Sequence, residues 1–396
     1  MSEAIHRPNP VDRASVYVAV GAISGSGVLV SSAAPIIVGA LASRFPFSQS
    51  QLGDIIALYN LAFTLIAVAA LFCVRKVNWR TTALFASAVG VGGFAALTQF
   101  GGYGPILALF GLIGLSAGAL YSLGMAITGD SDRPDKAFGL KLGIESAPTI
   151  ALLYLIPAIA IPLGGFNAAA LTFAATFLLL GLGSFALPSS GVKGGDAAEG
   201  QPATLAPAAN ASLVPSLLVL TGSIIFFAGI AATWAFLELI AIEREFSSDA
   251  IGVVFAVGFC VAAGGGFLAA YIEDRFGRVA PVAATIAVLI VGLVLIGMSD
   301  DVWSFALGVL VFLGTVNFGL AYFFGMSARV DLTGRFVVLS ATTLSIGGVI
   351  GPAVGGRLIE QAGIVGMLTF TGLCGVLSLL IYAFVNRKYQ HLRTVN

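Results

Sequence analysis

Long apolar runs separated by short polar breaks recur along the whole chain, and they constrain its fold more than any other feature. A helix needs about 20 mostly apolar residues to cross a bilayer, and these runs reach that length. The breaks predict twelve spans, near residues 14–42, 51–73, 81–99, 104–128, 138–162, 166–187, 213–241, 248–271, 279–297, 302–328, 335–361 and 364–386. We therefore predict an all-α integral membrane protein with twelve transmembrane helices.

The composition agrees with a chain that lies in lipid. Of the 396 residues, 58% are hydrophobic and 10% are charged, whereas a soluble domain carries about 25% charged residues. The 19 basic and 19 acidic side chains give a net charge of 0. A balanced charge provides no electrostatic attraction for nucleic acid, so we exclude a nucleic-acid partner and expect the lipid bilayer as the surrounding partner.

The residues of common catalytic and metal sites are sparse. The 2 histidines, His6 and His391, lie in polar tails, and the 3 cysteines, Cys73, Cys260 and Cys374, lie far apart in apolar runs. No Cys/His spacing suits a metal, and no histidine lies near a nucleophile or in an H-E-x-x-H pattern. We expect no enzymatic activity, no metal and no cofactor.

Lysine and arginine positions predict the orientation, because basic residues favour the cytoplasmic side. With the N-terminus inside, 15 of the 19 basic residues fall in cytoplasmic segments, and only Arg44, Arg244 and Arg357 fall outside. Lys141 lies within a span. The first apolar run has no convincing cleavage site, so we expect a retained first span. We predict a multi-pass protein of the inner (plasma) membrane with both termini in the cytoplasm.

One stretch, residues 188–212, is rich in Ala, Gly, Pro and Ser and lacks a helical apolar stripe. It predicts a flexible cytoplasmic linker between an N-terminal part, 1–187, and a C-terminal part, 213–396, with six spans each. The two parts share a weak repeat, because F-S-x-x-x-L-G starts at Phe47 and F-S-x-x-x-I-G starts 199 residues later at Phe246.

These features together resemble the major facilitator superfamily of secondary transporters over the whole chain. The sharpest match, A-Y-I-E-D-R-F-G-R at 270–278, is similar to the family's G-x-x-x-D-R-x-G-R loop, with Ala270 in place of the first glycine. The corresponding N-terminal loop, 73–80, lacks the acid. The resemblance implies two six-helix bundles with pseudo-two-fold symmetry, which rock about a site near the bilayer midplane.

A second match is G-P-x-x-G-G at 351–356 in the eleventh span. In this family the pattern marks antiporters when it lies in the fifth span, but the fifth span here reads E-S-A-P-T-I at 145–150. The antiporter inference does not carry over, and uptake is favoured over export. Small residues and proline predict a segment that packs closely and bends.

Lys141 and Glu145 are the strongest functional candidates, because ionisable groups within the membrane are costly. They lie four apart on the fifth span and so share one helix face. If the span begins near Phe138, Glu145 lies about 10 Å along its axis, where it could bind and release a proton. In the alternative interpretation, Lys141 extends to the cytoplasmic surface and Glu145 merely pairs with it.

Two sets of charges are candidate gates. Asp54 and Arg357 lie at predicted outer ends of the second and eleventh spans, and the resemblance implies that they pair when the outer gate closes; otherwise they are two solvated charges. Asp274, Arg275 and Arg278 fit a cytoplasmic counterpart, in which the acid accepts from amides at the start of the fifth span. The alternative is charge that only sets topology.

Other candidates lie inside spans. Glu238, near the outer end of the seventh span, either lines the opening of the site or faces water. Uncharged side chains that could offer hydrogen bonds or aromatic faces to a solute are Tyr59, Asn60, Tyr121, Tyr154, Trp234, Asn317 and Tyr322.

We therefore predict a secondary transporter that moves a small organic solute by alternating access, acts as a proton-coupled symporter and works as a monomer. The mixed Lys141/Glu145 face suits a charged or zwitterionic solute, and the coupling ion is a proton or another ion. One alternative is an exporter of lipophilic compounds or lipids on the same fold. The other is a membrane sensor that does not transport, although the chain shows no sizeable soluble domain.

Overall fold

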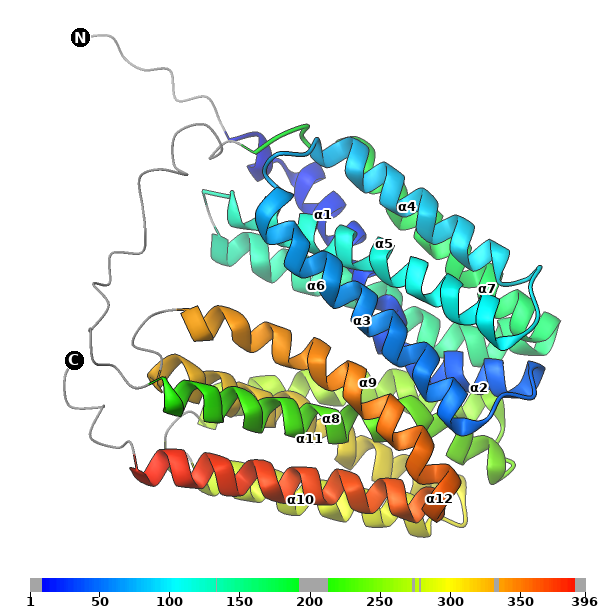
Figure 1. Ribbon diagram of the computed structural model, residues 1–396, viewed down its shortest axis with the longest axis vertical. Coiled ribbons are helices and arrows are strands. Elements are labelled where there is room, and N and C mark those ends of the chain that lie inside the picture. The colour runs from blue at the N-terminus through cyan, green and yellow to red at the C-terminus, as the bar shows by residue number, and fades with distance from the viewer. Residues whose placement is uncertain are drawn as a thin grey trace. The chain divides into compact units, whose positions relative to one another are not determined.

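The computed structural model describes residues 9–132, 134–191, 213–272, 275–277, 279–330 and 335–388. These residues are helical almost throughout (Figure 1). Within them, the only β interaction is an isolated bridge between Arg275 and Gly277. The predicted all-α fold is confirmed.

The helices follow the predicted spans closely. Their bounds are α1 Ala14–Ser32, α2 Ala34–Arg44, α3 Gln49–Cys73, α4 Trp79–Ala96, α5 Tyr103–Gly129, α6 Pro134–Leu155, α7 Ile161–Gly181, α8 Val214–Glu243, α9 Ser248–Ile272, α10 Val279–Met298, α11 Val302–Val330 and α12 Arg335–Lys388. Short helical turns complete the list: η1 Pro10–Asp12, η2 Ile156–Ala160 and η3 Leu182–Ala186.

The number of spans agrees with the prediction of twelve once merged helices are divided. In the described part of the chain, nine helices are long and apolar enough to cross a membrane, and two of these are runs of 47 residues that each contain two spans. The less apolar α4 completes the set. Helices α1 and α2 together cover the first predicted span, 14–42.

Glycines mark the two places where merged runs reverse. Gly165 has φ +58° between the fifth and sixth spans, and Gly363 has φ +69° between the eleventh and twelfth. Glycine adopts this left-handed region without the steric cost of a Cβ. The predicted boundaries between 162 and 166 and between 361 and 364 fall at these residues.

Proline explains the irregular helices. The first span breaks at Ala33, where φ is −100° and ψ is 16°, two residues before Pro35. Pro157 lies in the π-helical turn η2, which joins α6 to α7. A proline lacks the backbone N–H and its ring crowds the preceding turn, so both helices deviate where these prolines occur.

The described residues belong to two compact units. Unit 1 contains Met1–Ala33, Leu61–Leu152 and Gly164–Pro202, and unit 2 contains Ala34–Asn60, Leu153–Leu163 and Ala203–Asn396. Unit 2 therefore includes α2 and the first part of α3 together with α8 to α12. The predicted division into residues 1–187 and 213–396 stays a prediction, and residues 192–212 of the predicted linker lie outside the described residues.

In unit 1, α1 packs against α5 and α6 through small residues. A methyl group added at Gly21 would lie 2.5 Å from Cβ of Ile144 on α6, and one at Gly27 would lie 2.7 Å from Cβ of Tyr121 on α5. The core of the same unit contains Phe94 of α4 stacked on Phe173 of α7, with ring centroids 5.0 Å apart. Glycines on α1 thus allow this helix to lie close to α5 and α6, which carry the candidate solute site.

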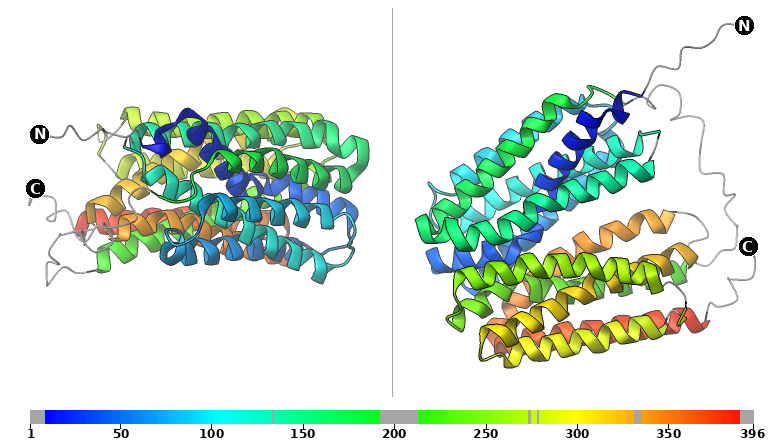
Figure 2. Two further views of the ribbon diagram at one scale, coloured as in Figure 1. Left: turned by 90° about the horizontal axis from the view of Figure 1, so that it is seen from above. Right: turned by 180° about the vertical axis from the view of Figure 1, so that it is seen from behind.

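In unit 2, the first part of α12, drawn in orange in Figure 2, packs on one face against α8 and on another against the first part of α3. A methyl group at Gly351 would overlap the carbonyl oxygen of Ala228 on α8, whereas one at Gly356 would overlap that of Gln49 on α3. The row facing α8 is Gly347, Gly351 and Gly355, and the row facing α3 is Gly348, Pro352 and Gly356. The G-P-x-x-G-G sequence therefore allows close packing on two faces of one helix.

Candidate functional site

Lys141 and Glu145 form a buried ion pair on α6. Lys141 Nζ donates to Glu145 Oε2 at 2.6 Å, and the two side chains are 1% and 8% exposed. The spacing of four residues places both on one helix face. Because Lys141 is buried, the alternative in which it extends to the surface does not describe this structure.

Tyr121 on α5 covers the cation of this pair. Lys141 Nζ lies 4.3 Å from the centroid of the Tyr121 ring, a distance at which the aromatic face attracts a cation. Phe63 on α3 packs against Tyr121, with the centroids of the two rings 5.8 Å apart. The site thus combines a cation, a carboxylate and an aromatic face.

Helix α1 packs against α6 at the backbone of Glu145. A methyl group at Gly25 would lie 3.4 Å from both Cα and the carbonyl oxygen of Glu145, and 3.2 Å from Pro148. These distances are tighter than most Cβ contacts, so a larger residue at this position would require the neighbouring atoms to shift. The glycine therefore allows α1 to lie close to the turn of α6 that carries Glu145.

Thr149 extends the polar face of α6 and was missed in the sequence. It lies four residues beyond Glu145, is 1% exposed, and its Oγ1 has no hydrogen-bond partner among the described residues. A buried hydroxyl without a partner is uncommon and can donate to a ligand. The signal was present, because 141, 145 and 149 follow the four-residue spacing of one helix face.

Asp54 and Arg357 are in contact in unit 2. Arg357 Nη1 donates to Asp54 Oδ1 at 2.7 Å and Nη2 donates to Oδ2 at 3.1 Å. The side chains of Asp54 and Arg357 are 31% and 51% exposed. The structure therefore joins the residues of the predicted outer gate, and their role in gating stays a prediction.

Further contacts between α3 and α12 flank this pair. Glu360 Oε1 accepts from the backbone N–H of Ser50 at 2.7 Å, and Asn60 Nδ2 donates to the carbonyl oxygen of Gly348 at 3.0 Å. Residue numbers rise along α3 from 50 to 60 as they fall along α12 from 360 to 348, so the helices run antiparallel. A methyl group at Gly53 would overlap the carbonyl oxygen of Pro352.

The uncharged candidates lie in different surroundings. Tyr59 is fully buried, whereas Tyr154 is 43% exposed and Asn317 is exposed.

The two buried aromatic candidates on α8 and α11 pack against other rings. The ring of Trp234 lies against those of two α9 residues, Phe255 and Phe259, with centroid distances of 5.5 and 5.6 Å. Tyr322 is buried beside Phe318, with ring centroids 5.3 Å apart. These side chains therefore differ in exposure and in the residues that surround them.

Glu238 is buried, so the prediction's alternative in which it faces water is wrong. It is 3% exposed on α8, and its Oε2 has no hydrogen-bond partner among the described residues. Its carboxyl lies against the backbone of α2 at Gly39. The side chain therefore meets protein rather than solvent at this end of the helix.

The predicted cytoplasmic gate is described only in part. Arg275 is exposed, and its guanidinium lies 4.7 Å from the centroid of the Tyr271 ring. Asp274 and Arg278 lie outside the described residues. The contact of this loop with the fifth span stays a prediction.

The N-terminal loop contains an ion pair that was missed in the sequence. Arg75 donates to Asp130 at the end of α5, at 2.9 Å and 3.4 Å, and the Asp130 side chain is fully buried. Trp79 packs beside it, and its backbone N–H donates to the Ser189 carbonyl oxygen at 2.9 Å. Arg75 therefore pairs with an acid at the end of another helix instead of one within its own loop.

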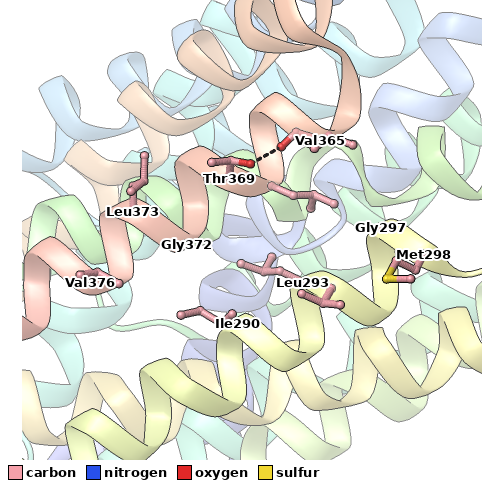
Figure 3. A pocket seen from close by; sticks show the side chains of 11 residues that line it. Ile290, Leu293, Gly297, Met298, Val365, Thr369, Gly372, Leu373 and Val376 are labelled. Atoms are coloured by element: carbon pink, nitrogen blue, oxygen red, sulfur yellow. Dashed lines mark hydrogen bonds between the residues drawn. The ribbon is translucent and has the colours of Figure 1, made fainter.

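An open apolar groove of about 440 Å³ lies between α10 and the last part of α12 (Figure 3). Figure 3 shows Leu293 and Met298 on one side and Leu373 and Val376 on the other. The hydroxyl of Thr369, also at the groove, donates to the Val365 carbonyl at 2.7 Å within its own helix. The groove lining has no charged residue and includes neither Lys141 nor Glu145.

The described residues contain no group of three or more His, Cys, Asp or Glu side chains that could hold a metal ion.

The candidate site is a buried ion pair between transmembrane helices, with hydroxyl and aromatic groups around it. Such a site in a helical multi-span fold is typical of membrane transporters.

The sequence model of the Major Facilitator Superfamily matches residues 17–337, and the chain belongs to this superfamily. In structure it is similar to the nucleoside transporter NupG, with 13% identity, coverage of 96% of this chain and 99% of that chain, and a TM-score of 0.71. It is also similar to a bacterial homolog of the human lysosomal transporter Spinster in an inward-facing, unoccupied conformation. There the identity is 12%, the coverage is 96% of both chains and the TM-score is 0.69.

At these identities the structural matches show the fold alone, and no curated protein matches the chain in sequence. The family membership establishes a multi-pass integral membrane protein that acts as a secondary transporter of a small molecule and is not an enzyme.

Proposed function

We propose that this transporter is a proton-coupled symporter of a small organic solute that carries an anionic group, either an acid or a zwitterion. The observation that supports this proposal is the buried ion pair between Lys141 and Glu145. A lone buried charge is costly, whereas a hydrogen-bonded pair in the same place is tolerated. The pair thus provides a cation and an exchangeable carboxylate in one site.

The pair offers a direct way to link the solute to a proton. When the anionic group of the solute binds Lys141, it takes the place of Glu145 as the partner of the cation. Glu145 then lacks a counter-charge in a buried position, where the neutral acid is favoured, and it takes up a proton. Solute and proton are therefore bound together, and both leave when the site opens to the other side.

Tyr121 and Thr149 complete the proposed site. The Tyr121 ring contacts the ammonium group of Lys141 through its aromatic face. The Thr149 hydroxyl, which has no partner among the described residues, is available for a polar group of the solute. A lipophilic solute would gain nothing from these groups. The buried position of Lys141 thus favours a charged solute over the alternative of lipid export.

We also propose that residues 1–187 and 213–396 act as two bundles that rock in alternating access, with both termini in the cytoplasm of a cell whose inner membrane holds the protein. The contact of Asp54 with Arg357 then closes the outer gate, and the loop with Asp274, Arg275 and Arg278 holds the cytoplasmic gate. Among the similar structures, the Spinster homolog is inward-facing, which is the arrangement that a closed outer gate requires.

The test is solute-dependent proton movement in proteoliposomes that contain a pH-sensitive dye. The solute panel contains organic acids, amino acids, amines, sugars and nucleosides, the last because a similar structure is a nucleoside transporter. The wild-type protein is compared with Glu145→Gln and with Glu243→Gln, a matched change at an exposed acid on α8.

We expect at least one anionic or zwitterionic solute to move protons with the wild-type protein and with Glu243→Gln, but not with Glu145→Gln. Solute uptake without proton movement would contradict the coupling. Equal proton movement with Glu145→Gln would remove Glu145 from the coupling site.

A further inference from the structure

Glu238 is an acid on α8 that neither the proposed solute site nor the proposed gate uses. Every residue from Ala228 to Ala241 is buried, so Glu238 lies within a long covered part of the helix. Its side chain is 3% exposed, and its Oε2 has no hydrogen-bond partner among the described residues. A buried carboxyl oxygen without a partner needs an explanation.

Helix α2 covers this carboxyl through Gly39. A methyl group at Gly39 would lie 2.8 Å from Cδ and 2.9 Å from Oε1 of Glu238. The backbone of α2 can approach the acid this closely only because residue 39 has no side chain. Separation of α2 from α8 would therefore uncover Glu238 directly.

The charged groups on the surrounding helices do not satisfy this acid. Helix α8 packs against α2, α11 and α12 and touches α9 through Trp234. On these elements and directly after α8, the charged or titratable groups whose side chains are described are Arg44, Glu243, Arg244, Asp249, Cys260, Tyr271, Tyr322, Arg357, Glu360, Cys374, Tyr382, Arg387 and Lys388. None of them hydrogen-bonds to Glu238 Oε2 within the described part of the chain.

Arg44, Arg244 and Arg357 have other partners. Arg357 binds Asp54, and Arg244 donates to the carbonyl oxygens of Ile296 and Gly297. Arg44, at the end of α2, lies over the ring of its neighbour Phe45 at 5.6 Å. A carboxylate buried without a cation is unfavourable, whereas the neutral acid is tolerated. The packing of α2 on α8 is therefore compatible with the protonated side chain.

We propose that Glu238 is a second proton-binding site, which keeps its proton while Gly39 of α2 covers it and loses the proton when the two helices separate. Protonation then stabilises the closed contact between α2 and α8, and ionisation stabilises the open one. This inference rests on the proposed alternating access, in which α2 and α8 move with different bundles. It requires no particular solute and no role for Glu145.

The test measures the distance between spin labels on α2 and α8 as a function of pH. Ser43 and Glu243 are exposed residues on these helices, and cysteines introduced there in a background without native cysteines carry the labels. The protein is held in lipid nanodiscs from about pH 5 to about pH 9, a range over which buried carboxyl groups titrate. Double electron–electron resonance gives the distance distribution without solute or an ion gradient.

In wild-type protein we expect the short distance to dominate at low pH, and the ratio of closed to open forms to fall about tenfold as the pH rises. Glu238→Gln should keep the short distance at every pH, because the amide matches the neutral acid in size. Asp249→Asn, a change at an exposed acid at the start of α9, should keep the wild-type response.

Two results would overturn the proposal: wild-type distances that do not depend on pH, or a Glu238→Gln response equal to that of the wild type. The wild-type titration alone can give the first result, even if the glutamine variant folds poorly. Because no solute is present, a failure of solute-driven proton transport is distinguishable from a failure here.

Discussion

The guanidinium of Arg357 binds the carboxylate of Asp54 through two hydrogen bonds, at 2.7 Å and 3.1 Å, between helices that run antiparallel. Both side chains are partly exposed, and exposed ion pairs contribute little to stability. Their bidentate geometry nevertheless defines one register of α3 on α12. We therefore expect the pair to affect the populations of the conformations more than the stability of the fold.

We expect Asp54→Asn to change the free energy of unfolding by less than about 1 kcal/mol but to lower the population of the closed contact between α3 and α12. Spin labels at two exposed residues, Ser48 and Gln361, report this population. The charge exchange of Asp54→Arg with Arg357→Asp should restore the closed distance. An unchanged distance distribution in Asp54→Asn would show that the pair has no role in closure.

The two glycine faces of α12 predict different defects. Gly351→Ala would place its methyl group against the Ala228 carbonyl of α8 and should lower the melting temperature, because overpacking typically costs about 1–3 kcal/mol. Gly53→Ala would meet the Pro352 carbonyl and should mainly prevent closure of α3 on α12, with loss of transport in folded protein.

The matched control for these changes is Gly92→Ala on α4, where an added methyl group meets no atom within 4 Å. Alanine favours a helix by about 1 kcal/mol over glycine, so this variant should be as stable as the wild type or more so. Thermal unfolding in detergent and solute uptake give the comparison. Equal effects of Gly53→Ala and Gly351→Ala on unfolding would contradict the assignment of separate faces.

Removal of Arg75 should destabilise unit 1, because it leaves the buried carboxylate of Asp130 without its cation. A buried acceptor without a partner costs about 1–3 kcal/mol, so Arg75→Ala should unfold at a lower temperature. The next residue, Lys76, is a basic side chain that is also exposed, and Lys76→Ala is therefore the matched control. A normal melting temperature for Arg75→Ala would argue against the importance of this pair.

Asp301 should support the start of α11 in a pH-dependent way. Its carboxylate accepts from the N–H groups of Ser304 and Trp303 and from the Ser304 hydroxyl, and these hydrogen bonds hold the pKa of Asp301 below its usual value. The stabilisation from these hydrogen bonds is complete at pH values above the pKa of about 3.9 that an aspartate has in the unfolded chain. It is lost as the pH falls through the lower pKa of Asp301 in the folded protein. Asp301→Ala should reduce the melting temperature at neutral pH, and a difference from the wild type that does not shrink in acid would contradict this.

Much of the fold could be predicted from the sequence because polar breaks mark the ends of membrane spans. The reversals at Gly165 and Gly363 lie where the spans were expected to end. The division of the first span at Ala33 was not predicted, although Pro35 was a visible signal for it. Proline disturbs the turn before it, but its presence in the sequence does not determine whether the helix bends or breaks.

The candidate site was predicted less completely, because pairing between distant residues is not encoded in a single local pattern. Lys141 and Glu145 were found since they are four residues apart, whereas Arg75 and Asp130 are separated by 55 residues. The burial of Glu238 depends on Gly39, which lies on another helix. Hydropathy along α8 contains no information about that contact.

In the proposed mechanism, the solute replaces Glu145 as the partner of Lys141 and so causes Glu145 to bind a proton. The most direct measurement is proton uptake when a solute identified by the transport assay is added to purified protein in weakly buffered detergent solution. We predict uptake of about one proton per bound solute in wild-type protein, and binding without proton uptake in Glu145→Gln. Solute binding to wild-type protein with no proton uptake would show that the solute does not displace Glu145 from Lys141 in this way.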